Sequence, residues 1–177
     1  MRHPAHHHPH ISAQPGVATI DYFLKIDGIP GESQDIKHKG EIEVGTWSWG
    51  ETAAVPTAPG AGGGAGKVTI QPFTFSSGIS KASPLLMKAC ASGQHVKNAL
   101  FTARRGGQTQ VEFLTIALGD VVVTSYQTGG GEDGSAPLES ISFNFRTIRV
   151  EYRETKPDGT VGTPVVFAWD LAKGAGF

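Results

Sequence analysis

A glycine-rich stretch, GAGGGAGKVT at residues 60–69, comes close to the phosphate-binding loop of nucleotide-binding proteins. That loop has a Gly, four residues, Gly-Lys and then Ser or Thr, because backbone amides wrap the phosphates and the hydroxyl holds magnesium. Lys67 fits the pattern, but Ala61 stands at the first glycine position and Val68 at the hydroxyl position. The true motif also opens a helix, whereas this stretch leads into a predicted strand. The glycines therefore predict a flexible connection between strands and no nucleotide site.

Histidines gather near the N-terminus, where imidazoles could chelate a transition metal. Five of the seven lie there: His3, His6, His7, His8 and His10. The same segment contains several prolines and has no apolar periodicity, which is typical of a disordered tail or of a cloning remnant. Residues 1–18 are therefore predicted to form a disordered His/Pro-rich extension without a metal site.

Three carboxylates in and after the turn DGIPGES could bind calcium: Asp27, Glu32 and Asp35. A calcium loop needs Asp or Asn where this sequence has Ile29, and its glycine falls at a different place. These residues are therefore predicted to be solvated loop carboxylates.

Catalytic patterns are also missing from the sequence. No Gly-x-Ser-x-Gly motif is present, and no His-Glu-x-x-His or paired-cysteine spacing that would bind a metal. Outside the tail, His38 is predicted to lie on a solvated strand end and His95 near a helix exit, neither as a general base. Arg104 and Arg105 read as a solvated hairpin end. The sequence predicts no enzyme, no cofactor and no metal.

The elements that carry these residues are mostly strands that change face midway. Apolar residues switch sides near Gly45 in EIEVGTWSWG, across Pro72 in KVTIQPFTF, and between Phe145 and Ile148 in SISFNFRTIRVEY. Long strands of this kind suit a strongly bent barrel, or strands that leave the barrel for another surface. Trp47 and Trp49 share one strand face and are predicted to fill a core or a subunit contact.

One helix is predicted in SPLLMKACASG. Ser83 suits the N-cap, Pro84 the first helical position and Gly93 the left-handed stop. One helix face is expected to pack on the barrel through Leu85, Leu86, Ala89 and Cys90. Cys90, the only cysteine, is predicted to be a small buried hydrophobe, so no internal disulfide can form. The predicted fold is an antiparallel β-barrel carrying one α-helix.

Composition excludes several classes of protein. The 177 residues contain 15 Lys and Arg against 16 Asp and Glu, so no overall field would attract nucleic acid. With 24 glycines and 11 prolines, the chain favours a turn-rich β architecture. No apolar run resembles a secretory signal or a membrane span, which predicts a chain made in the cytoplasm.

Five segments, in this order and spacing, resemble the haemolysin-coregulated protein (Hcp) family, the tube subunits of bacterial type VI secretion. They are DYFLKIDGIPGES, KHKGEIEVGTWSWG, SPLLMKACASG, VEFLTIALGDVVVTSYQ and SISFNFRTIRVEY. The resemblance extends from about Tyr22 to Trp169. The sequence departs from the family pattern in its His-rich extension and in the loop from Val55 to Gly66.

The resemblance implies one β-barrel domain, residues 19–173, with a short tail at 174–177. It implies a subunit that closes into hexameric rings, which stack into a hollow inner tube and can carry effectors in the lumen. A spike protein would cap the tube, and contraction of a surrounding sheath would expel it. Secretion without a signal peptide would follow.

Assembly of this kind needs two different complementary surfaces on each subunit. The segment 50–67 between two strands is the best candidate to reach a neighbouring subunit or ring, with Glu51, Thr52 and Lys67 flanking the contact. The alternative is a monomeric β-barrel binding module or enzyme with a pocket inside its own barrel. The two interpretations differ in particle mass and in the presence of a central hole.

Overall fold

A computed structural model describes residues 19–54, 68–107, 110–132 and 134–177. Its strands are β1 (Ile20–Ile26), β2 (Ile42–Ser48), β3 (Glu51–Ala53), β4 (Val68–Ile70), β5 (Phe73–Gly78), β6 (His95–Arg105), β7 (Val111–Gly129), β8 (Leu138–Tyr152) and β9 (Val165–Asp170). The helix α1 (Ala82–Ser92) connects β5 to β6.

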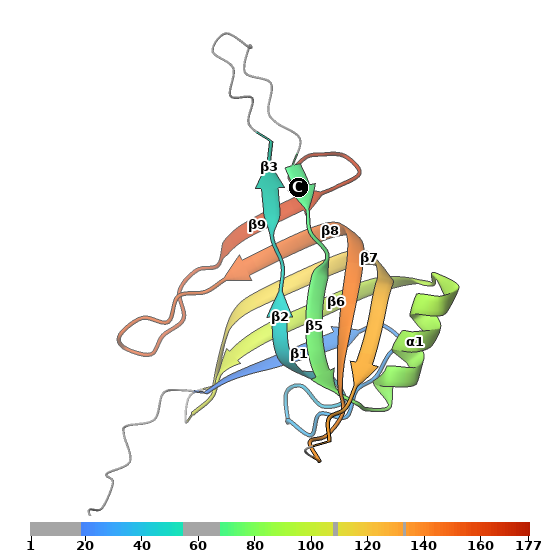
Figure 1. Cartoon of the computed structure of the whole chain (residues 1–177). Coiled ribbons are helices and arrows are strands. Elements are labelled where there is room, and N and C mark those ends of the chain that lie inside the picture. Colours follow the sequence, from blue (N-terminus) through green and yellow to red (C-terminus); the bar gives the residue numbers. More distant parts are fainter. Residues whose placement is uncertain (1–18, 55–67, 108–109, 133) are drawn as a thin grey trace, which may run out of the picture.

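Six strands close into an antiparallel barrel in the order β5-β2-β1-β6-β7-β8, because β5 pairs with both β2 and β8. Strand β9 continues the sheet outside the barrel by pairing with the second half of β8. Strands β3 and β4 form a separate two-stranded sheet that projects from one end (Figure 1). Helix α1 lies at the side of the barrel. The predicted fold class is confirmed.

The strands bend where the sequence changes phase. The pairing of β2 with β5 shifts register between Val44 and Thr46, next to Gly45. In β8 the buried side of the strand changes after Phe145, so that Ile148 points inward. The third predicted strand is divided at Pro72 into β4, which lies outside the barrel, and β5, which belongs to it. All three predicted phase changes are confirmed, and the bends let one strand serve two surfaces.

Aromatic rings fill the barrel interior. Phe73, Phe75, Phe101 and Phe143 are all fully buried. Trp47 packs among them, with its ring centroid 4.7 Å from that of Phe101. Trp49 directly follows β2 and packs against Phe167 of β9, at a centroid distance of 6.4 Å. The prediction that both tryptophans pack against the core is confirmed.

Helix α1 differs from the prediction at its start and on its buried face. It begins at Ala82, and Ser83 lies within the first turn, where its hydroxyl accepts a bond from Ser80 N. Leu85 is exposed, and Cys90 is only half-buried. The helix therefore starts two residues earlier than the cap pattern indicated, and the Ser83 hydroxyl bonds the backbone of Ser80 instead of capping the helix. The left-handed stop at Gly93, with φ of 63°, is confirmed.

None of the helices in the described part of the chain is long and apolar enough to cross a membrane.

Candidate assembly surfaces

The hairpin of β3 and β4 projects beyond the barrel. Its three residue pairs run from Glu51 opposite Ile70 to Ala53 opposite Val68. All three β3 residues are exposed, and only Ile70 of β4 is partly buried. At the base of the hairpin, Gln71 N donates a backbone hydrogen bond of 2.9 Å to Gly50 O. Isolated two-stranded hairpins are marginally stable in water, so this one gains from another partner.

The interface residues expected from the sequence fall partly on this hairpin. Glu51 and Thr52 are exposed on β3, opposite Ile70 and Thr69. Lys67, and the glycine-rich residues 55–66, lie outside the described residues. Val68, which follows them, begins a strand and not a helix.

Strand β9 presents an open edge. It pairs with β8 on one side, and along its other side the described residues supply a bridge only from Ala175 to Asp170. Val165 is 72% exposed and Val166 is 42% exposed. The sequence VVFAWD is apolar until its last residue. Strand edges that face solvent normally avoid such an apolar sequence, whereas covered edges favour it. The edge of β9 is therefore suited to contact with another chain.

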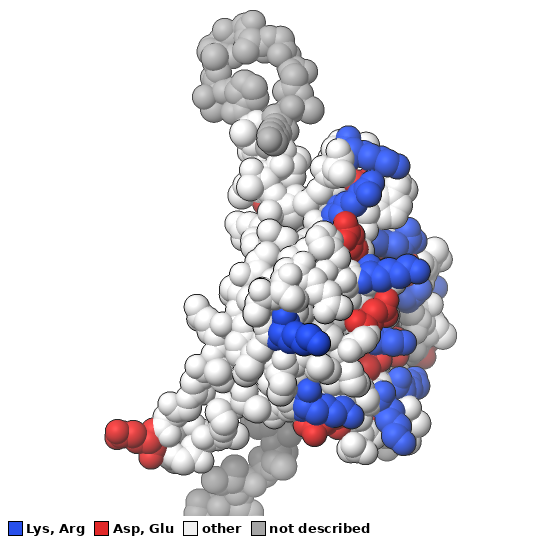
Figure 2. All heavy atoms as spheres, turned by 90° about the vertical axis from the view of Figure 1, so that its right-hand side faces the viewer, with Lys and Arg blue, Asp and Glu red and all other residues white. Residues whose placement is uncertain are grey.

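Hydroxyl groups cover the barrel wall made by β2, β5 and the first half of β8. Thr46 Oγ1 lies 2.7 Å from Ser76 Oγ, and Thr74 Oγ1 lies 2.9 Å from Ser142 Oγ. In Figure 2 the visible Lys and Arg side chains gather along the right-hand side, and the left-hand side, which faces the viewer of Figure 1, is nearly free of them. The barrel thus has one hydroxyl-rich wall and one charged wall.

A buried ion pair fixes the loop that connects β1 to β2, residues 27–41, to β6. Arg104 of β6 is 2% exposed and donates from Nη1 and Nη2 to the two carboxylate oxygens of Asp35, at 2.9 Å and 2.7 Å. Nη2 also reaches Asp21 at 3.2 Å. These bonds hold the pKa of Asp35 far below its usual range and raise that of Arg104.

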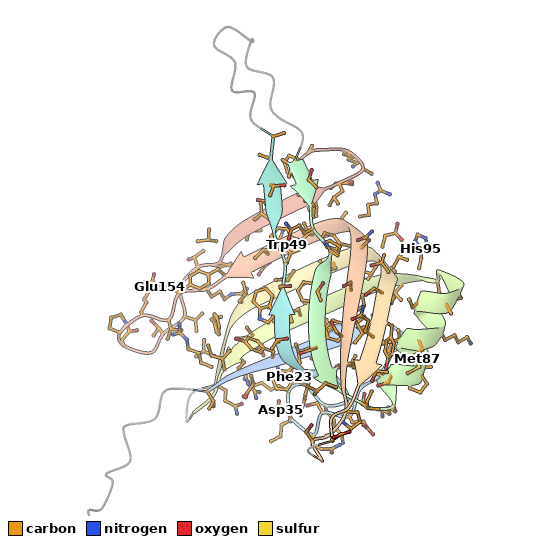
Figure 3. All side chains as sticks on the ribbon, in the orientation of Figure 1. Phe23, Asp35, Trp49, Met87, His95 and Glu154 are labelled. Atoms are coloured by element: carbon orange, nitrogen blue, oxygen red, sulfur yellow. The ribbon has the colours of Figure 1, made fainter. Side chains whose placement is uncertain are left out.

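His38 adds a second anchor for this loop. It is 5% exposed, and its ring stacks on Phe23 with centroids 4.1 Å apart. Nδ1 lies 2.9 Å from Glu41 Oε2. Nε2 lies 3.4 Å from Glu112 Oε1, within ion-pair range but without hydrogen-bond geometry. Figure 3 shows Phe23 and Asp35 in the same part of the molecule. The loop is thus bound to the barrel by charge, stacking and hydrogen bonds.

These observations correct three predictions. Asp35 is not a freely solvated carboxylate, Arg104 is not at a solvated hairpin end, and His38 is not on a solvated strand end. Arg105 is exposed as expected, and its guanidinium lies 5.1 Å from the centre of the Phe113 ring. The only sequence signal for the network was an arginine alternating with apolar residues in ALFTARR, which does not identify its partner.

A buried carboxylate also stands where β5 and β8 close the barrel. Glu139 is 2% exposed and accepts bonds from Ser77 Oγ at 2.9 Å and from the Tyr126 hydroxyl at 2.7 Å. Burial and the neighbouring carboxylate raise the pKa of Tyr126. Three strands therefore meet in one polar network at the closing seam, which the sequence did not reveal.

His95 of β6 and Asp120 of β7 form an exposed pair. His95 lies near the helix exit as predicted, largely exposed, with Nδ1 2.6 Å from Asp120 Oδ1. Asp120 has a positive φ of 53°. Among the described residues, no group of three or more His, Cys, Asp or Glu side chains could hold a metal ion.

The described residues define a mainly β protein, a closed antiparallel barrel with one helix, an open strand edge and a projecting hairpin. The family model for "Type VI secretion system effector, Hcp" matches residues 23–152. Protein hcp1 of Pseudomonas aeruginosa is 42% identical over 154 residues, which cover 86% of this chain and 95% of that protein. This chain belongs to the Hcp family and is a structural tube subunit of type VI secretion, not an enzyme.

Solved structures agree with this assignment. Hcp1 from Salmonella typhimurium is 32% identical, with a TM-score of 0.74, over 91% of this chain and 100% of that one. A type VI secretion system effector from Yersinia pestis is 34% identical, with a TM-score of 0.68, over 85% and 99%. A further type six secretion system protein has a TM-score of 0.83 at 28% identity, over 89% and 99%. Hcp homologues are secreted through the type VI system.

Proposed function

We propose that copies of this chain close into a six-membered ring through the open edge of β9. Val165 and Val166 are exposed on that edge, and Phe167 joins it to the barrel end through Trp49. A contact between this edge and a different surface of the next copy is heterologous, and such contacts form a ring when the rotation closes. The apolar, largely unpaired edge of β9 is the observation that carries the proposal.

The hairpin of β3 and β4 serves the contact between rings. It extends away from the barrel end, and its residues bury little surface within the chain. Glu51, Thr52 and Lys67 flank the connection between its strands. Stacking through this hairpin would add a partner to a sheet of two short strands, which is where such a sheet gains most stability.

The hydroxyl-rich wall faces the lumen in this proposal. Hydroxyl groups hydrogen-bond to many protein surfaces without binding one charge pattern strongly, which suits passage of varied effectors. The spike protein and the contractile sheath are the further partners, and the chain would be made in the cytoplasm and exported through the type VI apparatus. No nucleotide, cofactor or metal has a role.

The ring is tested by light scattering and negative-stain imaging of the purified chain. Particles near six times the mass of one chain, with a central hole, are expected. The double variant Val165→Lys and Val166→Lys places charges on the β9 edge and should give monomers with an unchanged thermal unfolding midpoint. Val161→Lys is the matched control, because Val161 is similarly exposed, at 45%, but lies outside the strand.

Rings that survive both edge substitutions would show that β9 is not the contact. A wild-type chain that stays monomeric at high concentration would favour the alternative, a monomeric β-barrel module.

The lumen assignment is tested by cysteine labelling. Asn144 is exposed on the hydroxyl-rich wall, and Lys37 is exposed on the loop at residues 27–41. In a Cys90→Ala background, a bulky PEG-maleimide should label Asn144→Cys more slowly after tube assembly than before. Lys37→Cys should label at the same rate in both states. Equal rates at Asn144→Cys before and after assembly would contradict the lumen assignment.

A further inference from the structure

The loop at residues 27–41 carries an unusual set of exposed side chains. Ile36 is 98% exposed, and Lys37 and Lys39 follow it in the chain. Together with Lys25 of β1, these two lysines line a cavity of about 430 Å³. Ile26, Ile29 and Pro30 also line this cavity. The four residues Lys25, Ile36, Lys37 and Lys39 are called the lysine surface below.

The backbone that presents these side chains is held in place. Asp35 Oδ1 accepts hydrogen bonds from Lys37 N at 2.9 Å and from His38 N at 3.2 Å. The same carboxylate is bound by buried Arg104, and the His38 ring is stacked on Phe23. Residues on both sides of Lys37 are therefore anchored to the barrel. The lysine surface is a pre-organised feature, which reduces the entropy lost on binding a partner.

The lysines of this surface have no ion-pair partner in the described part of the chain. Among the described residues, no ion pair or side-chain hydrogen bond involves the ammonium groups of Lys25, Lys37 or Lys39. Glu41 also lines the cavity, but its carboxylate is bound to His38 Nδ1. Like charges held close together repel, so a partner that supplies carboxylates would remove an unfavourable interaction.

We propose that the lysine surface docks an acidic protein segment that also carries an apolar side chain. The carboxylates would contact the three lysines, and the apolar side chain would cover Ile36. A protein partner fits better than nucleic acid, because the surface has no arginine or aromatic side chain that would bind phosphate or stack on bases, and the whole chain has a net charge of −1. The surface is distinct from the β9 edge and from the β3–β4 hairpin.

The proposal is tested with a fluorescein-labelled peptide of alternating Glu and Leu residues, bound to the full chain and followed by fluorescence anisotropy. The triple variant Lys25→Ala, Lys37→Ala and Lys39→Ala should bind about tenfold more weakly or worse, and affinity should fall with added salt. Ile36→Ala should also weaken binding. The matched control removes three exposed lysines elsewhere, by Lys81→Ala, Lys88→Ala and Lys156→Ala, and should bind within about twofold of the wild type.

Thermal unfolding checks that both triple variants fold like the wild type, as expected for exposed side chains. Equal weakening by the two triple variants would overturn the proposal, because only net charge would then matter. Absence of peptide binding by the wild type would also overturn it. A DNA duplex of the same concentration that binds through the same three lysines more tightly than the peptide would show that the partner class is wrong.

Discussion

Two segments leave the barrel wall, and they are held in opposite ways. The loop at residues 27–41 is tied to β6 and β7 by Arg104, by the His38 ring and by their carboxylate partners. The β3–β4 hairpin pairs only with itself, and almost all of its residues are exposed. Buried charged groups fix the position of loop 27–41 within the single chain. The hairpin has no such anchor in the described chain.

The difference separates folding from assembly. A segment that is pinned by buried groups contributes to the stability of the monomer, so substitutions there should be costly. A segment with few internal contacts contributes little to the monomer and is free to bind another chain. Substitutions in loop 27–41 should therefore lower the free energy of unfolding strongly, and changes in the hairpin should lower it little. Four experiments test this contrast, from the largest expected effect to the smallest.

The largest effect is expected from Arg104→Leu. Removing the guanidinium leaves Asp35 and Asp21 without their cation at a site that the loop covers, which should cost about 3 kcal/mol or more in the free energy of unfolding. Urea unfolding followed by tryptophan fluorescence measures it. Arg105→Leu, at the exposed neighbouring position, should change stability by less than about 0.5 kcal/mol. Similar effects at both positions would show that the loop is not pinned by charge.

A smaller loss is expected from His38→Ala. The variant removes the stacking on Phe23 and the 2.9 Å bond to Glu41, and it should cost about 2 kcal/mol. Amide hydrogen exchange of residues 31–41 should become faster, since the loop loses one of its anchors. His95→Ala serves as the control because that side chain is largely exposed. Unchanged exchange in His38→Ala would place the anchoring on Arg104 alone.

The pH dependence of stability should report the Asp35 ion pair. The Arg104 guanidinium lowers the pKa of Asp35 in the folded chain below the unfolded value. The carboxylate therefore stabilises the fold above the unfolded pKa, and this stabilisation is lost as the pH falls through the folded pKa. The stability difference between wild type and Asp35→Asn should stay constant from about pH 7 to about pH 5, and it should shrink as the pH falls further, because the unfolded carboxyl begins to bind a proton near its ordinary pKa of about 3.9.

Glu32→Gln, on the same loop and exposed, should show no such trend. A constant difference for Asp35→Asn across the range would contradict the role of the charged pair.

The smallest effect on the monomer is expected at the hairpin. Replacing residues 55–66 with an Asn-Gly turn should change the free energy of unfolding by no more than about 0.5 kcal/mol. The same variant should form fewer stacked rings in electron micrographs. A large loss of stability would mean that the hairpin belongs to the fold of the single chain, and unchanged stacking would remove it from the assembly surface.

Much of the architecture could be predicted from the sequence. The phase changes near Gly45, across Pro72 and after Phe145 predicted bent strands, and the helix stop at Gly93 is where the pattern placed it. The family resemblance rested on segments that the structure turns into β1, β2, α1, β7 and β8. These features depend on residues that lie close together in the chain, so local periodicity and backbone preference identify them.

The pairing of charges was decided only by the tertiary structure. Asp35 and Arg104 are 69 positions apart, and nothing near either residue shows that the other will cover it. His38 lies between two lysines, and this neighbourhood predicted a solvent-exposed ring. In the fold the ring is buried and stacks on Phe23. Ser83 likewise bonds the Ser80 backbone, and the helix begins at Ala82 and not at Pro84. A chain pattern reports which face a residue takes, but the energy of a buried charge depends on partners that only the closed barrel brings within hydrogen-bond distance.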